Sequence, residues 1–135
     1  MIREAEQIQR DISGIQNLIQ MGVESGHLLP RTREEIIEII EQRHFWVADH
    51  PLGIIGCAAL EVYSQRLAEI RSVAVLPAFR RTKLGTLLIE RCVEEARRLG
   101  IKELLSVTDQ VKFFESVGFR RQLKGQYPLF LKLEY

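Results

Sequence analysis

The chain has few of the residues that mark specialised classes of protein. Only two of its 135 residues are cysteine, Cys57 and Cys92, and both lie in apolar patterns far apart in the sequence. We therefore expect two buried thiols in a reducing cytoplasm rather than a disulfide. The three histidines are scattered, so neither residue type has the spacing of zinc ligands, and we expect no metal.

Long apolar runs and an excess of one charge are also missing. No run approaches the length of a membrane span, and residues 1–4 do not begin a signal peptide, so we expect no membrane partner. The net charge is only +1, which argues against a nucleic-acid partner. The GxxxxGK[ST] motif is absent, which disfavours a P-loop NTPase. Without repeats or linkers, residues 1–135 are expected to form one domain.

The segment from Glu69 to Ala96 has the most informative pattern that is present. It reads as a strand, a proline-marked loop rich in cations, and an amphipathic helix. Arg80, Arg81 and Lys83 lie where that helix begins. A helix start already has unpaired N–H groups and a partial positive charge. Three added cations predict an anion site suited to cofactor phosphates, the alternative being a solvated basic loop.

Apolar periodicity predicts the element order βααβββαβαβ, which is an α/β fold with a mixed sheet and helices on both faces. A capping box from Thr32 to Glu35 begins the second helix. The two strands that flank the helix after the cationic loop imply a right-handed parallel crossover. The expected strands are 1–4, 45–48, 54–63, 67–75, 103–107, 119–121 and 129–133, and the expected helices 8–23, 32–42, 84–99 and 111–117.

Two runs resemble the motifs of the GNAT acetyltransferases. The first is SVAVLP at 72–77 followed by RRTKLG at 80–85, where Arg80 and Gly85 match the family pattern and Lys83 replaces its first glycine. The second is FFESVGF at 113–119. A closer resemblance, to the short bacterial N-acetylglutamate synthases, rests on GHLLPR at 26–31, IGCAAL at 55–60 and AEIRSVAV at 68–75. The resemblance implies the GNAT fold with its splayed central sheet.

The resemblance also implies acetyl-CoA as the cofactor. Backbone N–H groups of the loop can cradle the pyrophosphate, and Gly85 permits close approach. In the family, the pantetheine arm pairs with the preceding strand, where an N–H can polarise the thioester carbonyl. The cofactor-binding residues expected on these grounds are Val73, Ala74, Val75, Arg80, Arg81, Thr82, Lys83, Leu84, Gly85 and Thr86.

Glu69 is the candidate general base that deprotonates the amine. Strand alternation predicts that it shares a face with Arg71, Val73 and Val75. The alternative is a surface ion pair with Arg71, which contributes little to stability. The family often has a tyrosine as general acid in the second motif, but Phe114 occupies that position here.

The acceptor is expected to be a small-molecule amine, with L-glutamate or another amino acid as the first candidate and arginine biosynthesis as the implied pathway. Arg31 and Arg71 are the candidate partners for acceptor carboxylates, because arginine binds carboxylate bidentately; each could instead be an ordinary exposed arginine. Because Lys83 and Phe114 depart from the family pattern, a non-catalytic acyl-CoA-binding module is a second hypothesis. A peptide or protein N-acetyltransferase is a third hypothesis. Exposed strand edges allow a homodimer.

Overall fold

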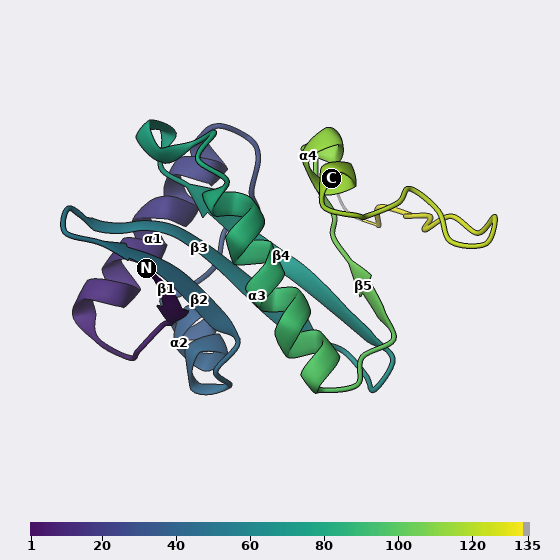
Figure 1. Cartoon of the computed structure of the whole chain (residues 1–135), viewed down its shortest axis with the longest axis horizontal. Helices are drawn as coiled ribbons and strands as arrows, with labels where there is room; N and C mark the ends of the chain where they lie inside the picture. The colour runs from purple at the N-terminus through teal and green to yellow at the C-terminus, as the bar shows by residue number, and fades with distance from the viewer. Residues whose placement is uncertain (134–135) are drawn as a thin grey trace.

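One mixed sheet forms the centre of the computed structural model, which describes residues 1–133 (Figure 1). Its strands lie in the order β1-β2-β3-β4-β5; the first four are antiparallel and β4 pairs with β5 in parallel. The strands are β1 (Ile2–Glu4), β2 (Phe45–His50), β3 (Gly53–Val62), β4 (Leu67–Val75) and β5 (Glu103–Leu105). The helices are α1 (Gln9–Glu24), α2 (Arg33–Glu41), α3 (Leu84–Arg98) and α4 (Val111–Ser116), with a 3₁₀ turn η1 (Pro77–Phe79).

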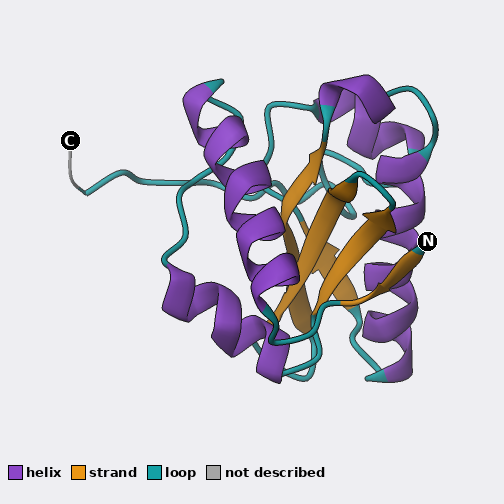
Figure 2. Cartoon of the chain, turned by 90° about the vertical axis from the view of Figure 1, so that its left-hand side faces the viewer, coloured by secondary structure: helices purple, strands orange, loops and turns teal. Residues whose placement is uncertain are grey.

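Helices cover both faces of the sheet, as expected (Figure 2). Helices α1 and α2 pack on one face through a cluster that includes Ile15, Ile36 and Phe45. Helix α3 packs on the other face, where Leu88, Ile89, Cys92 and Ala96 are buried. The capping box at Thr32 is formed as predicted, and Cys57 and Cys92 are buried free thiols. Among the described residues, no helix is long and apolar enough to span a membrane.

The sheet opens between β4 and β5. The two strands pair only over three positions, the last being Glu69 with Leu105. The next contact is a side-chain bond, from the Ser106 hydroxyl to the Ile70 carbonyl oxygen at 3.0 Å. β4 continues to Val75 beyond this point without a strand on that side. The predicted splay is therefore present, and it leaves one backbone edge of residues 71–75 without a neighbouring strand.

A bulge in β4 makes one sequence prediction wrong. Ala59 pairs with Arg71, but Cys57 pairs with Ala74, so β4 has one extra residue at this point. The bulge coincides with Ser72, whose φ of 55° lies in the left-handed region. Glu69 and Arg71 therefore face the side of α1 and α2. Val73 and Val75 pack with the α3 cluster on the opposite face, rather than sharing a face with Glu69 as alternation predicted.

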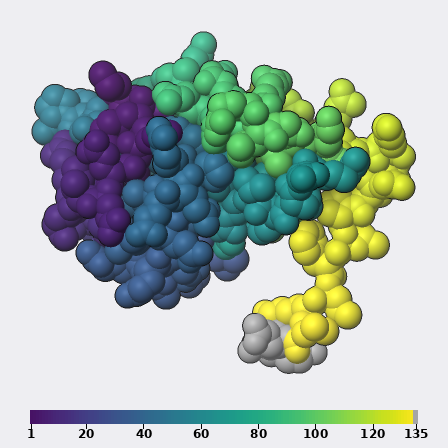
Figure 3. Space-filling model, turned by 90° about the horizontal axis from the view of Figure 1, so that it is seen from below, coloured from purple at the N-terminus to yellow at the C-terminus, as the bar shows by residue number. Residues whose placement is uncertain are grey.

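The predicted terminal strands 119–121 and 129–133 are also wrong for the described residues. After α4 the chain contains only an isolated bridge between Leu123 and Gln126. It then extends away from the body, as Figure 3 shows in yellow. Leu129, Phe130 and Leu131 are 90%, 74% and 83% exposed, so their β-forming side chains have no surface to pack against. The homodimer and the single-domain assignment stay predictions.

A buried ion network ties the N-terminal elements together. Asp11 of α1 is fully buried and accepts two hydrogen bonds from Arg3 of β1, at 2.7 and 2.9 Å. It also accepts the backbone N–H of Glu6 at 2.7 Å. Arg3 donates in addition to Asp49 of β2 at 3.0 Å. These charges hold α1 against the strand pair β1–β2 and so fix the helix that borders the candidate site.

Candidate active site

The cationic loop before α3 has the backbone geometry of an anion site. Arg81 and Lys83 both have φ values of 65°, in the left-handed region. Lys83 is the N-cap of α3 and makes no side-chain capping bond. Within residues 1–133, no protein acceptor is found for the backbone N–H groups from Arg81 to Thr86. A row of unpaired donors at a helix start fits a pyrophosphate, so this loop suits the phosphates of CoA.

Other contacts of the loop shape that site. The Arg80 guanidinium donates through Nε to the carbonyl oxygen of Val75 at 3.2 Å, which ties the loop to the end of β4. Arg81 and Lys83 are exposed and make no salt bridge among the described residues. A Cβ at Gly85 would lie 3.1 Å from the Phe113 ring. The small size of Gly85 therefore also lets α4 pack against the start of α3.

A second group of polar residues lies on the face of β4 that α1 and α2 cover, where β4 and β5 begin to separate. Arg31, from the loop before α2, is almost fully buried, with 3% of its side chain exposed. Its Nε donates to the Ser72 hydroxyl at 2.7 Å, and another guanidinium nitrogen donates to Glu61 of β3. A further charged group on this side, Glu35, lies 3.9 Å from Arg31 and is half exposed.

Arg71 and Glu69 complete this polar cluster, together with a tyrosine from the end of β3. Arg71 lies 3.3 Å from a Glu61 carboxylate oxygen and 4.0 Å from one of Glu69. The Tyr63 hydroxyl donates to Glu69 and lies 3.2 Å from Glu61. The structure thus brings together all three residues predicted for acceptor and base, Arg31, Arg71 and Glu69.

The electrostatics of the cluster are set by its paired charges. Burial disfavours the charge of Glu61, but the hydrogen bond and charge of Arg31 outweigh it and lower the pKa of Glu61. Burial likewise disfavours the charge of Arg71, yet Glu61 and Glu69 raise its pKa. Burial and the bond to Glu69 raise the pKa of Tyr63. Arg71 and Glu61 are therefore charged at neutral pH, and Tyr63 holds its proton.

The second motif provides packing at the position where the family often has its acid. Phe114 is buried and meets Phe113 and Phe119 edge to face, with ring centroids 5.4 and 5.2 Å away. The three phenylalanine rings of this cluster carry no proton donor themselves. The ring cluster anchors α4 on α3, and it supplies no general acid.

Two loops meet near the splay through polar side chains. His27, after α1, lies 2.6 Å from Asp109, before α4, and both are about half exposed. The hydrogen bond to His27 lowers the pKa of Asp109. This bond joins the loop between α1 and α2 to the loop between β5 and α4.

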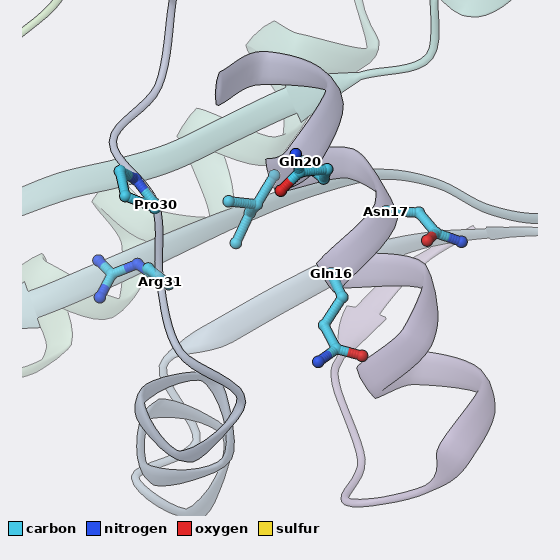
Figure 4. A pocket seen from close by; sticks show the side chains of 6 residues that line it. Gln16, Asn17, Gln20, Pro30 and Arg31 are labelled. Atoms are coloured by element: carbon cyan, nitrogen blue, oxygen red, sulfur yellow. The ribbon is translucent and has the colours of Figure 1, made fainter. Parts of the chain in front are cut away.

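A separate hollow of about 300 Å³ lies between α1 and the Pro30–Arg31 loop. Its polar lining comes from Gln16, Asn17 and Gln20, while the Arg31 side chain turns away from it (Figure 4). The Arg31 guanidinium donates a hydrogen bond to Glu61 in the polar cluster instead. Among residues 1–133, no group of three or more metal-ligating side chains is found.

Fold and site together define a CoA-dependent acyltransferase, and the comparisons with known proteins identify the family. The model of the acetyltransferase (GNAT) domain matches residues 41–121, so the chain belongs to this family. It is an acetyl-CoA-dependent N-acetyltransferase. An uncharacterized N-acetyltransferase of Chlorobaculum tepidum is 37% identical over 87% of this chain and 75% of its own length.

Amino-acid acetyltransferases are among the further relatives. That of Aeromonas salmonicida is 36% identical over 81% of this chain. The chain spans only about a quarter of the length of this relative, 25%. Rv2747 from Mycobacterium tuberculosis, solved with CoA and NLQ, has a TM-score of 0.81 at 30% identity over 93% of this chain and 74% of its own. N-acetylglutamate synthase from Neisseria gonorrhoeae, solved with coenzyme A and N-acetyl-glutamate, gives 0.80 at 31% identity over 89% and 28%.

Three residues of the polar cluster were not among the site residues predicted from the sequence: Glu61, Ser72 and Tyr63. Glu61 lies in none of the family-like runs, and Ser72 begins the SVAVLP run without any sign of its role there, because both roles come from contact with Arg31, 30 and 41 positions away. Tyr63 could have been found from its position, since it follows β3 and its hydroxyl reaches Glu69 across the hairpin. Alternation alone would have placed Glu61 and Tyr63 together on one face.

Proposed function

We propose that this N-acetyltransferase acetylates the α-amine of a free amino acid, with L-glutamate as the first candidate. The observation that carries the proposal is the convergence of Arg31, Arg71 and Glu69 on one face of β4, at the point where β4 and β5 separate. Arginines suit the carboxylate of an amino acid, and a carboxylate suits its amine. The names of two matched proteins, amino-acid acetyltransferase and N-acetylglutamate synthase, support the same substrate class.

The proposed division of work follows the two faces and the open edge of β4. The donors at Arg81–Thr86, with the cations Arg80, Arg81 and Lys83, hold the phosphates. Backbone groups at Val73, Ala74 and Val75 line the splay, where an N–H can polarise a carbonyl. When bound, acetyl-CoA would supply the acetyl group as a thioester: the acceptor nitrogen would form the new C–N bond, and the sulfur would take the electron pair of the broken C–S bond.

Before the attack, Glu69 accepts the proton that the acceptor ammonium must lose, directly or through one water. Tyr63 donates a hydrogen bond to Glu69 and orients its carboxylate. No protonated side chain is needed for the departing sulfur, because a thiol of pKa about 8.5 leaves as thiolate. This agrees with the position of Phe114 in an apolar ring cluster.

A panel of acceptors tests the proposal. Thiol release from acetyl-CoA is followed with free amino acids, with neutral amines, and with a peptide that has a free N-terminus. We expect turnover on amino acids and none on the peptide. Turnover on the peptide alone would favour the protein N-acetyltransferase instead, and absence of turnover on every amine would refute the proposed function.

The role of Glu69 has its own test. Glu69→Gln should lower kcat and flatten the rise of rate with pH, because the glutamine amide cannot accept the proton. Glu103→Gln is the matched control, since Glu103 lies on the neighbouring strand and is largely exposed. An unchanged pH profile in Glu69→Gln would remove Glu69 from the mechanism.

A further inference from the structure

Glu61 occupies the place that an acceptor carboxylate would need. Its two oxygens contact both candidate carboxylate-binding arginines: one bonds Arg31, and both lie 3.3 to 3.4 Å from an Arg71 nitrogen. The two arginines therefore already have a carboxylate between them. With Glu69, the cluster contains two positive and two negative charges.

This charge balance matters for an anionic acceptor. A carboxylate entering the cluster gains full benefit from Arg31 and Arg71 only if Glu61 moves away, because two carboxylates on the same donors repel each other. We propose that Glu61 is an internal counter-ion that an acceptor carboxylate displaces, and that it thereby sets the affinity for carboxylate-bearing acceptors. The identity of the acceptor rests on the proposed function; the competition between carboxylates rests on the cluster geometry.

The geometry also indicates which partner moves. Arg31 is held by the Ser72 hydroxyl at 2.7 Å and is nearly fully buried. Glu61 is the second-last residue of β3, next to the hairpin, and about a fifth of its side chain is exposed. The Tyr63 hydroxyl lies 3.2 Å from Glu61, but its one proton is donated to Glu69, so water is the partner available to a displaced Glu61. Displacement therefore leaves Arg31 in place and turns Glu61 toward the solvent.

The experiment compares wild type, Glu61→Gln and a control, Glu35→Gln. Glu35 also faces Arg31, at 3.9 Å, but is half exposed, and glutamine preserves its capping box with Thr32. The probe is glutarate, a dicarboxylate without an amine, so its binding requires no acetyl transfer. Glu61→Gln should have a lower Tm than wild type, and saturating glutarate should raise that Tm by roughly 4 °C more than it raises that of wild type or Glu35→Gln.

Kinetics give the second readout. In Glu61→Gln we expect KM for L-glutamate to fall roughly tenfold and KM for an amino-acid amide to stay unaltered. If Glu61→Gln does not fold, Glu61→Asp keeps the charge with a shorter reach and should shift both readouts in the same direction by a smaller factor. An equal or smaller glutarate shift, or a raised KM for glutamate, would overturn the proposal. Absence of turnover in wild type would refute the proposed function only, since the glutarate shifts still decide the role of Glu61.

Discussion

Lys83 offers the sharpest test of how the loop holds a cofactor. It stands where the family pattern has glycine, its φ is 65°, and its side chain is exposed. A left-handed conformation costs a non-glycine residue ~1 kcal/mol, which Lys83→Gly would relieve. Glycine loses ~0.4–1 kcal/mol to the freedom of the unfolded chain. We therefore expect the free energy of unfolding of Lys83→Gly to stay within ~0.5 kcal/mol of wild type.

The loss of the cation should appear in CoA binding instead. Two unit charges 4 Å apart in water interact by ~1 kcal/mol, and this value applies because Lys83 is exposed. Both Lys83→Gly and Lys83→Ala should therefore raise the Kd for CoA about fivefold at low salt. The difference from wild type should shrink at high salt, where charges are screened. Lys83→Ala keeps the left-handed strain, so it should be the less stable of the two variants.

Isothermal titration calorimetry with CoA at two salt concentrations, together with urea unfolding, measures all of these quantities. Lys124→Ala is the matched control, because Lys124 is an exposed lysine with a φ of 51° that lies in the extended tail. Wild-type affinity in both Lys83 variants would refute the contact between Lys83 and the phosphates. Weaker binding in the alanine variant alone would show that the backbone conformation matters and the charge does not.

Two further predictions concern buried side chains. Asp11→Ala should lower the free energy of unfolding in urea by ~3 kcal/mol, because it leaves Arg3 without its buried partner. Burial disfavours the charged form of Asp11, but the hydrogen bonds from Arg3 and the Glu6 N–H outweigh it and lower the folded pKa of Asp11 below 3.8. Wild-type stability should therefore fall as pH drops below about 4. The variant should lose this part of the acid dependence. A variant with the same acid profile would contradict the assignment. Phe114→Tyr should lower the free energy of unfolding by ~1–3 kcal/mol, because the new hydroxyl would lie in an apolar ring cluster. It should not raise kcat. A higher kcat would show that the missing general acid limits the rate.

Sequence periodicity predicted the elements whose stability comes from local pattern. The stripe with Leu88 and Cys92 and the capping box at Thr32 both follow from residues within a turn or two of one another. The bulge at Ser72 could not be predicted, because serine is no signal for a left-handed φ and one backbone angle reverses the faces of Val73 and Val75. The predicted strand at 129–133 is wrong for another reason: these residues have strand propensity, but a strand also needs a neighbouring strand to pair with.

Of the candidate site, Arg31, Glu69 and Arg71 are brought together as expected from the resemblance, while Glu61 became visible only in the structure. A sequence shows which residues are charged, but it does not show which charges are neutralised by contacts 10 or 30 residues away. Glu61, the carboxylate proposed to compete for the arginines, is therefore the part of the site that only the structure reveals.

The bulge at Ser72 has a consequence for engineering. Because Val73 and Val75 face α3 while Glu69 and Arg71 do not, the side chains proposed to bind the acceptor do not contribute to the packing that supports the proposed phosphate loop. On this proposal, substitution at Glu61 or Arg71 should alter acceptor preference and leave CoA binding intact. Deleting Ser72 would leave both sets of side chains on their present faces, since the residue removed is the extra one of the bulge, but it would take away the hydroxyl that holds Arg31.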